Sequence, residues 1–312
     1  GVDTSNYTTS AAVYNAETGE MIHQKQPLPV KDGELGLRQS DAVFHHTRLL
    51  PDVIGKLFSE YRGKITAAAA SDRPSQAEGS YMPCFLSGMG AARQIASVLH
   101  IPVYRFSHQQ GHVAAAAFGA NRTDLLKREF LAFHVSGGTT DALLVRPDHE
   151  SVISCERVAG SLDLKAGQLI DRIGLMLGLP FPAGPRLEAL AGNALGRYHP
   201  KPVLKDVWCS LSGIENQCTK LHEQGEPDAE IALFCICSIL AAINGMTEKL
   251  LTDYPNRPVL YAGGVMSNRL LRTELENRYG GCFAPPAFSA DNAAGIALLA
   301  SMQTEGSDVY CR

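Results

Sequence analysis

The pattern that most constrains this fold occurs twice in the chain: an apolar strand, a short Ser/Thr/Gly turn and a second apolar strand. The first copy is GVDTSNYTTSAAVYN at 1–15, and the second is REFLAFHVSGGTTDALLVRP at 128–147. This repetition predicts two related lobes, each beginning with a hairpin whose turn presents backbone N–H groups and hydroxyls. A length of 312 residues is long for one core and agrees with two lobes.

Composition narrows the class of protein. The net charge of −4 and the pI near 6.2 do not suggest a chain that binds nucleic acid unaided, so RNA contact would need a local patch or a basic partner. Eight cysteines without CxxC spacing predict neither a zinc ribbon nor disulfides, which favours the cytoplasm. We find no signal peptide and no apolar run near the ~18 residues of a membrane span, and expect a soluble protein. Since Gly1 lies in an expected strand, we expect an initiator Met to have been lost.

Apolar spacing predicts the other elements. In the first half we expect a helix at 41–61 interrupted by Pro51, a strand at 65–70, a loop at 71–81, a helix at 87–100 and a strand at 101–107. In the second half, the apolar segment 229–254 predicts a long buried helix. The segment 257–279 predicts a strand, a glycine turn and a helix, whose first N–H groups suit a phosphate.

His108 and His112 are four residues apart in HQQGH, which on a helix places both imidazoles on one face, as two ligands of a divalent metal require. The alternative is one solvated and one packed histidine. Asp291, in SADNAAG before the last expected helix, is a candidate third ligand and equally a candidate N-cap, and the two roles are compatible. Of the adjacent His45 and His46, at most one can point at a site.

Other motifs are ambiguous when taken singly. The turn VSGGTTD at 135–141 and the turn GGVMSN at 263–268 are either plain turns or places where backbone approaches a ligand. Asp171 falls within an expected helix, where a solvated carboxylate is the alternative. Ser210 and Ser212 have no His or Asp at an activating spacing, and GxSxG is absent, which argues against a serine hydrolase.

The order of these motifs carries more information than any one of them. HxxGH, VSGG with a Thr, AGQxxD, PxxGP, SxSG, GGVxxN and ADNAAG together resemble the TsaD and Kae family. These proteins, once described as O-sialoglycoprotein endopeptidases (Gcp), make threonylcarbamoyladenosine in tRNA. The resemblance implies an α/β fold of the actin/Hsp70/sugar-kinase (ASKHA) type, with a nucleotide cleft between two related lobes. We place lobe I at 1–117 with the C-terminal helix at about 294–312, and lobe II at 118–293.

The resemblance also implies a ligand set. His108, His112 and Asp291 would bind one divalent ion, iron or zinc. No catalytic residue is assigned. ATP, AMP or threonylcarbamoyl-adenylate would be bound by a second group of residues. That group is Val135, Ser136, Gly137, Gly138, Thr139, Asp171, Gly184 and Asn268. The implied partners are tRNA, reached through partner proteins, and the other subunits of the threonylcarbamoylation machinery. We expect no membrane partner and keep a dimer open.

Three departures from the family pattern matter. Thr139 stands where the family usually has the His of SGGHT, the usual ETSCDDT has become VDTSNYTTS, and a GPG-type stretch has become SDRPSQAEGSY. Three activities therefore stay open: the tRNA transferase, a related carbamoyltransferase with another acceptor, and a non-catalytic nucleotide-binding paralogue or scaffold. An endopeptidase is rejected because Gln109 occupies the place of the Glu in HExxH. A sugar kinase is disfavoured because the HxxxH pair has no role in phosphoryl transfer on that fold.

Overall fold

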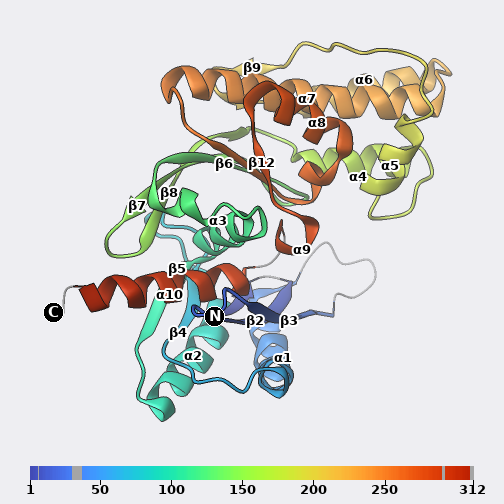
Figure 1. Ribbon diagram of the computed structural model, residues 1–312. Coiled ribbons are helices and arrows are strands. Elements are labelled where there is room, and N and C mark those ends of the chain that lie inside the picture. The colour runs from blue at the N-terminus through green and yellow to red at the C-terminus, as the bar shows by residue number, and fades with distance from the viewer. Residues whose placement is uncertain (6, 30–36, 290–291, 310–312) are drawn as a thin grey trace. The chain divides into compact units, whose positions relative to one another are not determined.

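The computed structural model describes residues 1–5, 7–29, 37–289 and 292–309 (Figure 1). Contacts among Cα atoms divide the chain into two compact units. Unit 1 comprises Gly1–Arg128, Arg146–Cys155 and Ala287–Arg312, and unit 2 comprises Glu129–Val145 and Glu156–Pro286. The lobe boundaries expected from the sequence stay a prediction.

Unit 1 contains a five-stranded sheet of order β3-β2-β1-β4-β5, in which β1 is antiparallel to β2 and parallel to β4. Its elements are β1 (Val2–Ser5), β2 (Thr8–Tyr14), β3 (Met21–Pro27), α1 (Gln39–Glu60), β4 (Ala68–Arg73), α2 (Phe85–Leu99), β5 (Val103–Ser107), α3 (His108–Gly119), the 3-10 helix η1 (Thr123–Lys127) and α10 (Ala293–Val309). The β1–β2 hairpin confirms the first of the two predicted hairpins.

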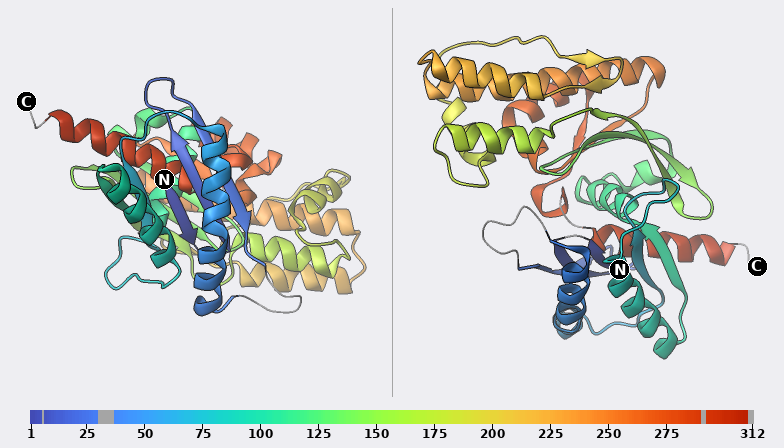
Figure 2. Two further views of the ribbon diagram at one scale, coloured as in Figure 1. Left: turned by 90° about the horizontal axis from the view of Figure 1, so that it is seen from below. Right: turned by 180° about the vertical axis from the view of Figure 1, so that it is seen from behind.

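The two faces of this sheet carry different helices because side chains alternate along β1 and β2. Val2 and Val13 belong to an apolar cluster with residues of α1 and α2, whereas Ala12 packs with Ala115 of α3 and Ala293 of α10. Figure 2 shows α10, in red, running across the sheet. Asp3, which alternates with Val2, therefore points to the face that carries α3 and α10.

Unit 2 contains a seven-stranded sheet of order β12-β11-β6-β7-β8-β10-β9. Its elements are β6 (Phe130–Val135), β7 (Thr140–Asp148), β8 (Val152–Ser161), α4 (Ala166–Met176), α5 (Gly184–Ala191), β9 (Leu204–Lys205), β10 (Trp208–Cys209), α6 (Ser212–Glu223), α7 (Asp228–Asp253), β11 (Val259–Ala262), the 3-10 helix η2 (Gly264–Ser267), α8 (Arg269–Tyr279) and β12 (Cys282–Phe283). The short helix α9 (Pro286–Ser289) belongs to unit 1 apart from Pro286. The β6–β7 hairpin confirms the second predicted hairpin. The tip of the β7–β8 connection belongs to unit 1.

The two sheets share one strand order. Five strands of the second sheet, taken from β8 through β7, β6 and β11 to β12, repeat the order of β3, β2, β1, β4 and β5. Directions agree as well, since β6 is antiparallel to β7 and parallel to β11, as β1 is to β2 and β4. The hairpins that the sequence presents twice therefore begin two sheets of the same topology.

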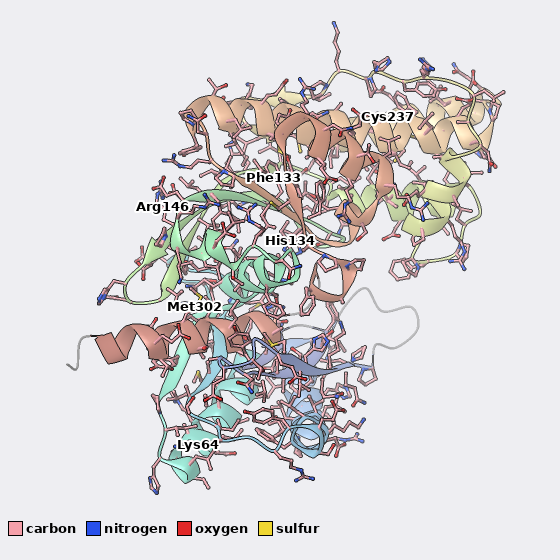
Figure 3. All side chains as sticks on the ribbon, viewed as in Figure 1. Lys64, Phe133, His134, Arg146, Cys237 and Met302 are labelled. Carbon is pink, nitrogen blue, oxygen red and sulfur yellow. The ribbon has the colours of Figure 1, made fainter. Side chains whose placement is uncertain are left out.

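The core of unit 2 lies between its sheet and helices α4 to α8. Phe133 of β6, labelled in Figure 3, packs against Tyr261 of β11 with ring centroids 5.2 Å apart. Helix α7 crosses this core, with 12 of its 26 residues buried, which confirms the long buried helix expected at 229–254. Cys155, Cys209, Cys218, Cys235 and Cys237 are free thiols.

Two expectations are wrong. Helix α7 is long and apolar enough to cross a membrane, so the statement that no segment has that length and composition does not hold. The apolar composition of α7 is explained by its packing in the core of unit 2. Pro51 does not interrupt α1, which runs unbroken from Gln39 to Glu60. The exposed proline removes one backbone hydrogen bond, but Ala42, His46, Leu50, Val53 and Leu57 keep one face of the helix buried on both sides of it.

His46 has a structural role. Its side chain is fully buried, and its Nδ1 lies 2.8 Å from Oγ1 of Thr9 on β2. Burial lowers the pKa of His46 from 6.5 to about 4, with a further lowering from His45 and an opposing effect from the charge of Asp3. The folded protein therefore holds His46 neutral in mildly acidic solution, where an unfolded chain would protonate it.

We expect His46 to make the protein less stable as the pH falls. Its folded pKa lies below its unfolded pKa, so its contribution is complete above pH 6.5 and is lost as the pH drops towards 4. Between pH 7.5 and 5 the loss is about 2 kcal/mol. Urea unfolding at both pH values measures it. His46→Asn, which can still hydrogen-bond Thr9, should reduce this loss, whereas His45→Asn on the half-buried neighbour should retain it. An unchanged pH dependence in His46→Asn would contradict the assignment.

Candidate functional site

Helix α3 begins at the first of the two candidate metal histidines. Ser107, the last residue of β5, accepts a hydrogen bond on Oγ from the N–H of Gln110 at 3.2 Å, and Oε1 of Gln110 accepts one from the N–H of Ser107 at 2.7 Å. This capping box starts the helix at His108. The fully buried Gln110 also donates from Nε2 to the carbonyl oxygen of Ile153 at 2.6 Å, which fixes the first turn of α3.

Two glycines let α10 approach α3 closely. A Cβ on Gly295 would lie 1.9 Å from the carbonyl oxygen of Gly111, and a Cβ on Gly111 would lie 3.1 Å from the carbonyl oxygen of Asn292. Only glycine at 295 permits this backbone contact. The G of HQQGH and the G of ADNAAG therefore meet, which explains why both motifs contain one.

The two histidines lie together, with ring centroids 4.5 Å apart and planes at 70°. Asn292 approaches the first of them, with its Nδ2 2.9 Å from Nδ1 of His108. Asp291, the third predicted ligand, lies outside the described residues. Among the residues that are described, no three His, Cys, Asp or Glu side chains form a group able to hold a metal ion.

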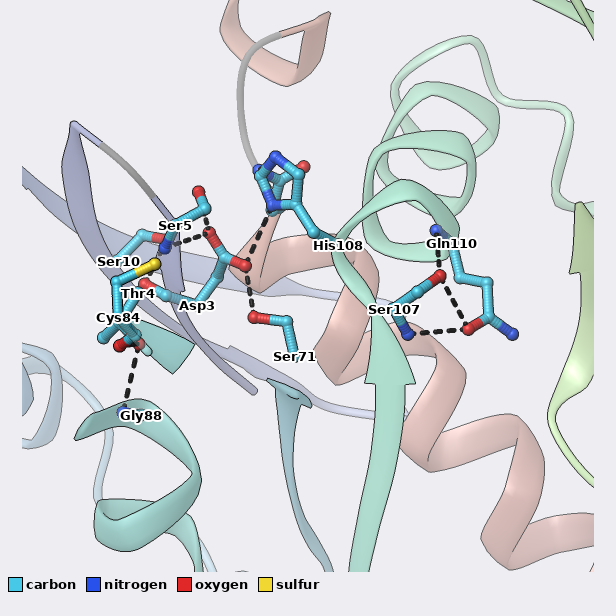
Figure 4. Close-up of polar contacts among 11 residues, drawn as sticks. Asp3, Thr4, Ser5, Ser10, Ser71, Cys84, Gly88, Ser107, His108 and Gln110 are labelled. Carbon is cyan, nitrogen blue, oxygen red and sulfur yellow. Dashed lines mark hydrogen bonds and ion pairs between the residues drawn. The ribbon is translucent and has the colours of Figure 1, made fainter. Parts of the chain in front are cut away.

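Asp3 is the acidic group at His108 (Figure 4). Its Oδ1 lies 3.1 Å from Nδ1 of His108 and accepts a hydrogen bond from Ser71, while its Oδ2 accepts one from the hydroxyl of Ser5 at 2.6 Å. Burial alone would raise the pKa of Asp3, but the charge of His108 and these hydrogen bonds lower it to about 2. The carboxylate therefore stays ionised at neutral pH.

The described donors fit a divalent metal as part of its ligand set. Two imidazoles on one helical face are ligands that iron and zinc accept. A carboxylate against Nδ1 of one histidine is the usual support for a ring that binds metal through Nε2.

The crossing of α3 and α10 gives a prediction about stability. Gly295→Ala places a methyl group against backbone that cannot move without separating the helices, so we expect the free energy of unfolding to fall by about 1–3 kcal/mol. The matched control is Gly90→Ala on α2, where a Cβ would meet nothing within 4 Å. That change should stabilise the protein by about 0.5–1 kcal/mol. Denaturant titration measures both, and equal effects would refute the packing argument.

In unit 2, the VSGG turn connects β6 to β7. The N–H of Ser136 donates to the carbonyl oxygen of Thr139 at 2.7 Å, and the N–H of Thr139 donates to Oγ of Ser136 at 3.2 Å. A Cβ on Gly137 or on Gly138 would meet nothing within 4 Å, and both glycines are exposed. The turn is therefore closed by its own hydrogen bonds and leaves space beside its two glycines.

Helix α4 begins against this turn. The N–H of Ala166 donates to the hydroxyl of the buried Thr140 at 2.9 Å, and the N–H of Gly167 donates to the carbonyl oxygen of Ser136 at 3.1 Å. A Cβ on Gly167 would lie 2.5 Å from the backbone nitrogen of Gly137. The glycine of AGQ is thus required by the contact between α4 and the VSGG turn.

The glycine turn after β11 meets the end of β6. Gly263 has φ +99°, and a Cβ there would lie 2.2 Å from the carbonyl oxygen of Val135. Asn268 caps α8, since its Oδ1 accepts hydrogen bonds from the N–H groups of Leu270 at 3.0 Å and Leu271 at 3.2 Å. The cap role was not predicted for Asn268.

Asp171 and Gly184 lie at the join between α4 and α5. Oδ1 of Asp171 accepts a hydrogen bond from the N–H of Ala183 at 2.9 Å, next to Gly184, the first residue of α5. Asp171 therefore has a structural partner and is not simply a solvated helix residue. A cavity of 570 Å³ in unit 2 is bordered by Asn268 and by Pro185 and Glu188 of α5.

The predicted groups thus fall into two sets. His108 and His112 are in unit 1, while the VSGG turn, Asp171, Gly184 and Asn268 are in unit 2. A family model described as TsaD, tRNA N6-adenosine threonylcarbamoyltransferase, matches residues 30–298. The chain belongs to this family.

Curated relatives agree with the TsaD assignment. A tRNA N6-adenosine threonylcarbamoyltransferase of Archaeoglobus fulgidus is 27% identical over 95% of this chain and 88% of its own length. One from Streptococcus agalactiae is 30% identical over 70% of this chain and 67% of its own. The family resemblance predicted from the order of the motifs is confirmed.

Solved structures show the fold. Component A of the (R)-2-hydroxyglutaryl-CoA dehydratase of Acidaminococcus fermentans aligns over 98% of both chains, with a TM-score of 0.54 and 13% identity. HypF of T. kodakarensis aligns over 98% of this chain and 48% of its own, with a TM-score of 0.58 and 12% identity. At such identities these likenesses concern the fold alone, and they confirm the actin/Hsp70/sugar-kinase class.

Several residues at these groups were not predicted. Asp3, Asn292 and Glu188 contact predicted residues or the cavity beside them. The sequence does contain one clue to Asp3. It is the only charged side chain among the first 15 residues, and it lies in a strand that is expected to be buried.

Proposed function

We propose that this TsaD-family chain transfers a threonylcarbamoyl group from threonylcarbamoyl-adenylate to N6 of an adenosine in tRNA. The observation that carries the proposal is the family match over residues 30–298. The acceptor tRNA is presented with the help of partner proteins, since the chain has a net charge of −4. In the reaction the N6 amine forms a bond to the carbamoyl carbon, the bond from that carbon to the phosphate oxygen breaks, AMP leaves, and the amine loses a proton.

The glycine turns of unit 2 are proposed to hold the adenylate. The exposed turn at Gly137 and Gly138 provides room for close approach of a phosphate to backbone, and backbone N–H groups in such turns bind anions. The cavity beside Asn268 is proposed for the adenosine, because 570 Å³ is within the usual range of small-molecule sites. Val135, Ser136 and Thr139 complete the turn. Asp171 holds the start of α5, the helix whose Pro185 and Glu188 border the cavity.

His108 and His112 are proposed to bind the divalent ion, iron or zinc, with Asp291 as the third ligand. When bound, such an ion supplies Lewis acidity to a phosphate or carbonyl oxygen. The protein's own contribution is to hold both imidazoles on one face of α3 and to keep a carboxylate against Nδ1 of His108.

A bulky side chain in the VSGG turn tests the nucleotide site. Gly138→Leu extends into open space, so we expect little change in stability but at least about tenfold weaker AMP binding, a loss of about 1.4 kcal/mol. The control is Gly213→Leu on α6, which is also exposed with nothing within 4 Å of its Cβ. Calorimetry with Zn²⁺ present measures binding. Equal AMP affinity in all three proteins would remove the turn from the site.

Thr139 decides how active the chain is. Its backbone closes the turn and its side chain is half-buried, so a larger residue can be accommodated without loss of the turn's hydrogen bonds. Threonine cannot supply a positive charge to a phosphate or carbonyl oxygen, whereas histidine can. We expect weak or absent transfer by the native chain alone and a gain of about ten- to a hundredfold in Thr139→His, since a charge-assisted hydrogen bond contributes about 1.5–3 kcal/mol.

The assay measures threonylcarbamoyladenosine formed on tRNA from supplied adenylate, with and without the family's partner proteins. Thr139→Gln, which is long and donates a hydrogen bond without a charge, should gain less than Thr139→His. High activity in the native chain would show that a histidine at 139 is dispensable. Binding of nucleotide without activity in any variant would favour the scaffold alternative, and transfer to an acceptor other than tRNA would favour a related carbamoyltransferase.

A further inference from the structure

We infer that Asp3 is a positioning residue: its carboxylate holds the imidazole of His108 in the tautomer protonated at Nδ1, so that Nε2 carries the lone pair offered to a divalent metal. The inference rests on the proposed metal site in unit 1. It assigns a role to a carboxylate that is 1% exposed, lies on a strand remote in sequence from α3, and is not itself proposed as a ligand.

The contacts around Asp3 determine which atom carries the proton. The carboxylate only accepts hydrogen bonds, and it does so from Ser71 on Oδ1 and from the N–H and hydroxyl of Ser5 on Oδ2, at 3.3 and 2.6 Å. Nδ1 of His108 lies 3.1 Å from Oδ1. If Nδ1 carried a lone pair, that lone pair would face a buried, ionised carboxylate, which is unfavourable. Protonation at Nδ1 turns the same approach into a charge-assisted hydrogen bond.

Asn292 is compatible with this tautomer. Its Nδ2 lies 2.9 Å from Nδ1 of His108, and an N–H cannot donate to a protonated nitrogen. Its Oδ1 is buried and has no hydrogen-bond partner among the described residues. Rotation of the amide by 180° brings Oδ1 to Nδ1 of His108, where it shares the single Nδ1 proton with Oδ1 of Asp3. The amide nitrogen of Asn292 also lies 3.3 Å from Nε2 of His108, so the closer of its two approaches to the ring is the one at Nδ1.

The position of Asp3 follows from strand alternation. Its neighbour Thr4 points to the opposite face, where its hydroxyl donates to the carbonyl oxygen of Cys84 at 2.9 Å and accepts from the N–H of Gly88 at 3.1 Å. Thr4 is as deeply buried as Asp3 but does not contact His108. The chain therefore offers Thr4→Val as a matched control, because it disturbs the same strand without touching the histidine.

The first experiment reads the tautomer directly in metal-free wild-type protein, by long-range ¹H–¹⁵N NMR of the imidazoles at pH 8, with His108→Gln to assign the resonance. We expect His108 to be protonated at Nδ1. Asp3→Ala should shift the ring towards the Nε2-protonated form, whereas Thr4→Val should leave it unchanged. An Nε2-protonated His108 in the wild type would overturn the inference, and this measurement requires no variant of Asp3 to fold.

The second experiment measures Zn²⁺ affinity by competition with a chelating dye. We expect Asp3→Ala to weaken binding by about 10–100-fold, Asp3→Glu to restore part of the loss, and Thr4→Val to bind as the wild type does. His112→Ala, which removes a proposed ligand, should lose at least about tenfold. Wild-type affinity in a folded Asp3→Ala protein would overturn the inference. Failure of the wild type itself to bind Zn²⁺ would refute the metal site, while the tautomer measurement would still decide what Asp3 does to His108.

Discussion

The close crossing of α3 and α10 is the contact on which the proposed metal site depends. Gly111 and Gly295 allow the two helix backbones to touch, and a side chain at 295 would force them apart. The crossing brings Asn292, from near the end of the chain, to His108, while the first strand brings Asp3 to the same ring. Three segments that are far apart in sequence thus meet at one imidazole, and the approach of one of them requires two positions without a side chain.

Glycines also permit close backbone contacts in unit 2. The VSGG turn is closed by hydrogen bonds between Ser136 and Thr139, and the hydroxyl of Thr140 receives the first N–H of α4. Glycine has two different uses there. Gly167 and Gly263 are required because backbone lies against them, whereas Gly137 and Gly138 border open space. The first two are needed for the fold, and the packing places no such demand on the second two.

Much of this could be predicted from the sequence, and the failures have physical causes. The hairpins, the histidine helix and the buried helix α7 follow from local patterns of apolar and small residues. The predicted interruption at Pro51 was wrong because the buried helix face on both sides of the proline outweighs the loss of one backbone hydrogen bond. The contacts of Asp3 with His108 and of Asp171 with Ala183 depend on which strand or loop lies alongside, and no spacing within a single segment contains that information. The order of the motifs identified the family because it samples the whole chain.

The path of the chain also constrains when each unit can form during synthesis. Every element that packs in the core of unit 2 precedes residue 287, so that unit can assemble as soon as β12 is available. Unit 1 begins with the first strand but is covered on one face by α10, whose residues 293–309 contact β1, β2 and β4. Until those residues leave the ribosome, Ala12 and Ala115 lack part of their apolar partner surface. The half of the protein that is translated first is therefore the half that must finish folding last, and a truncated product would leave an apolar sheet face exposed to chaperones and proteases.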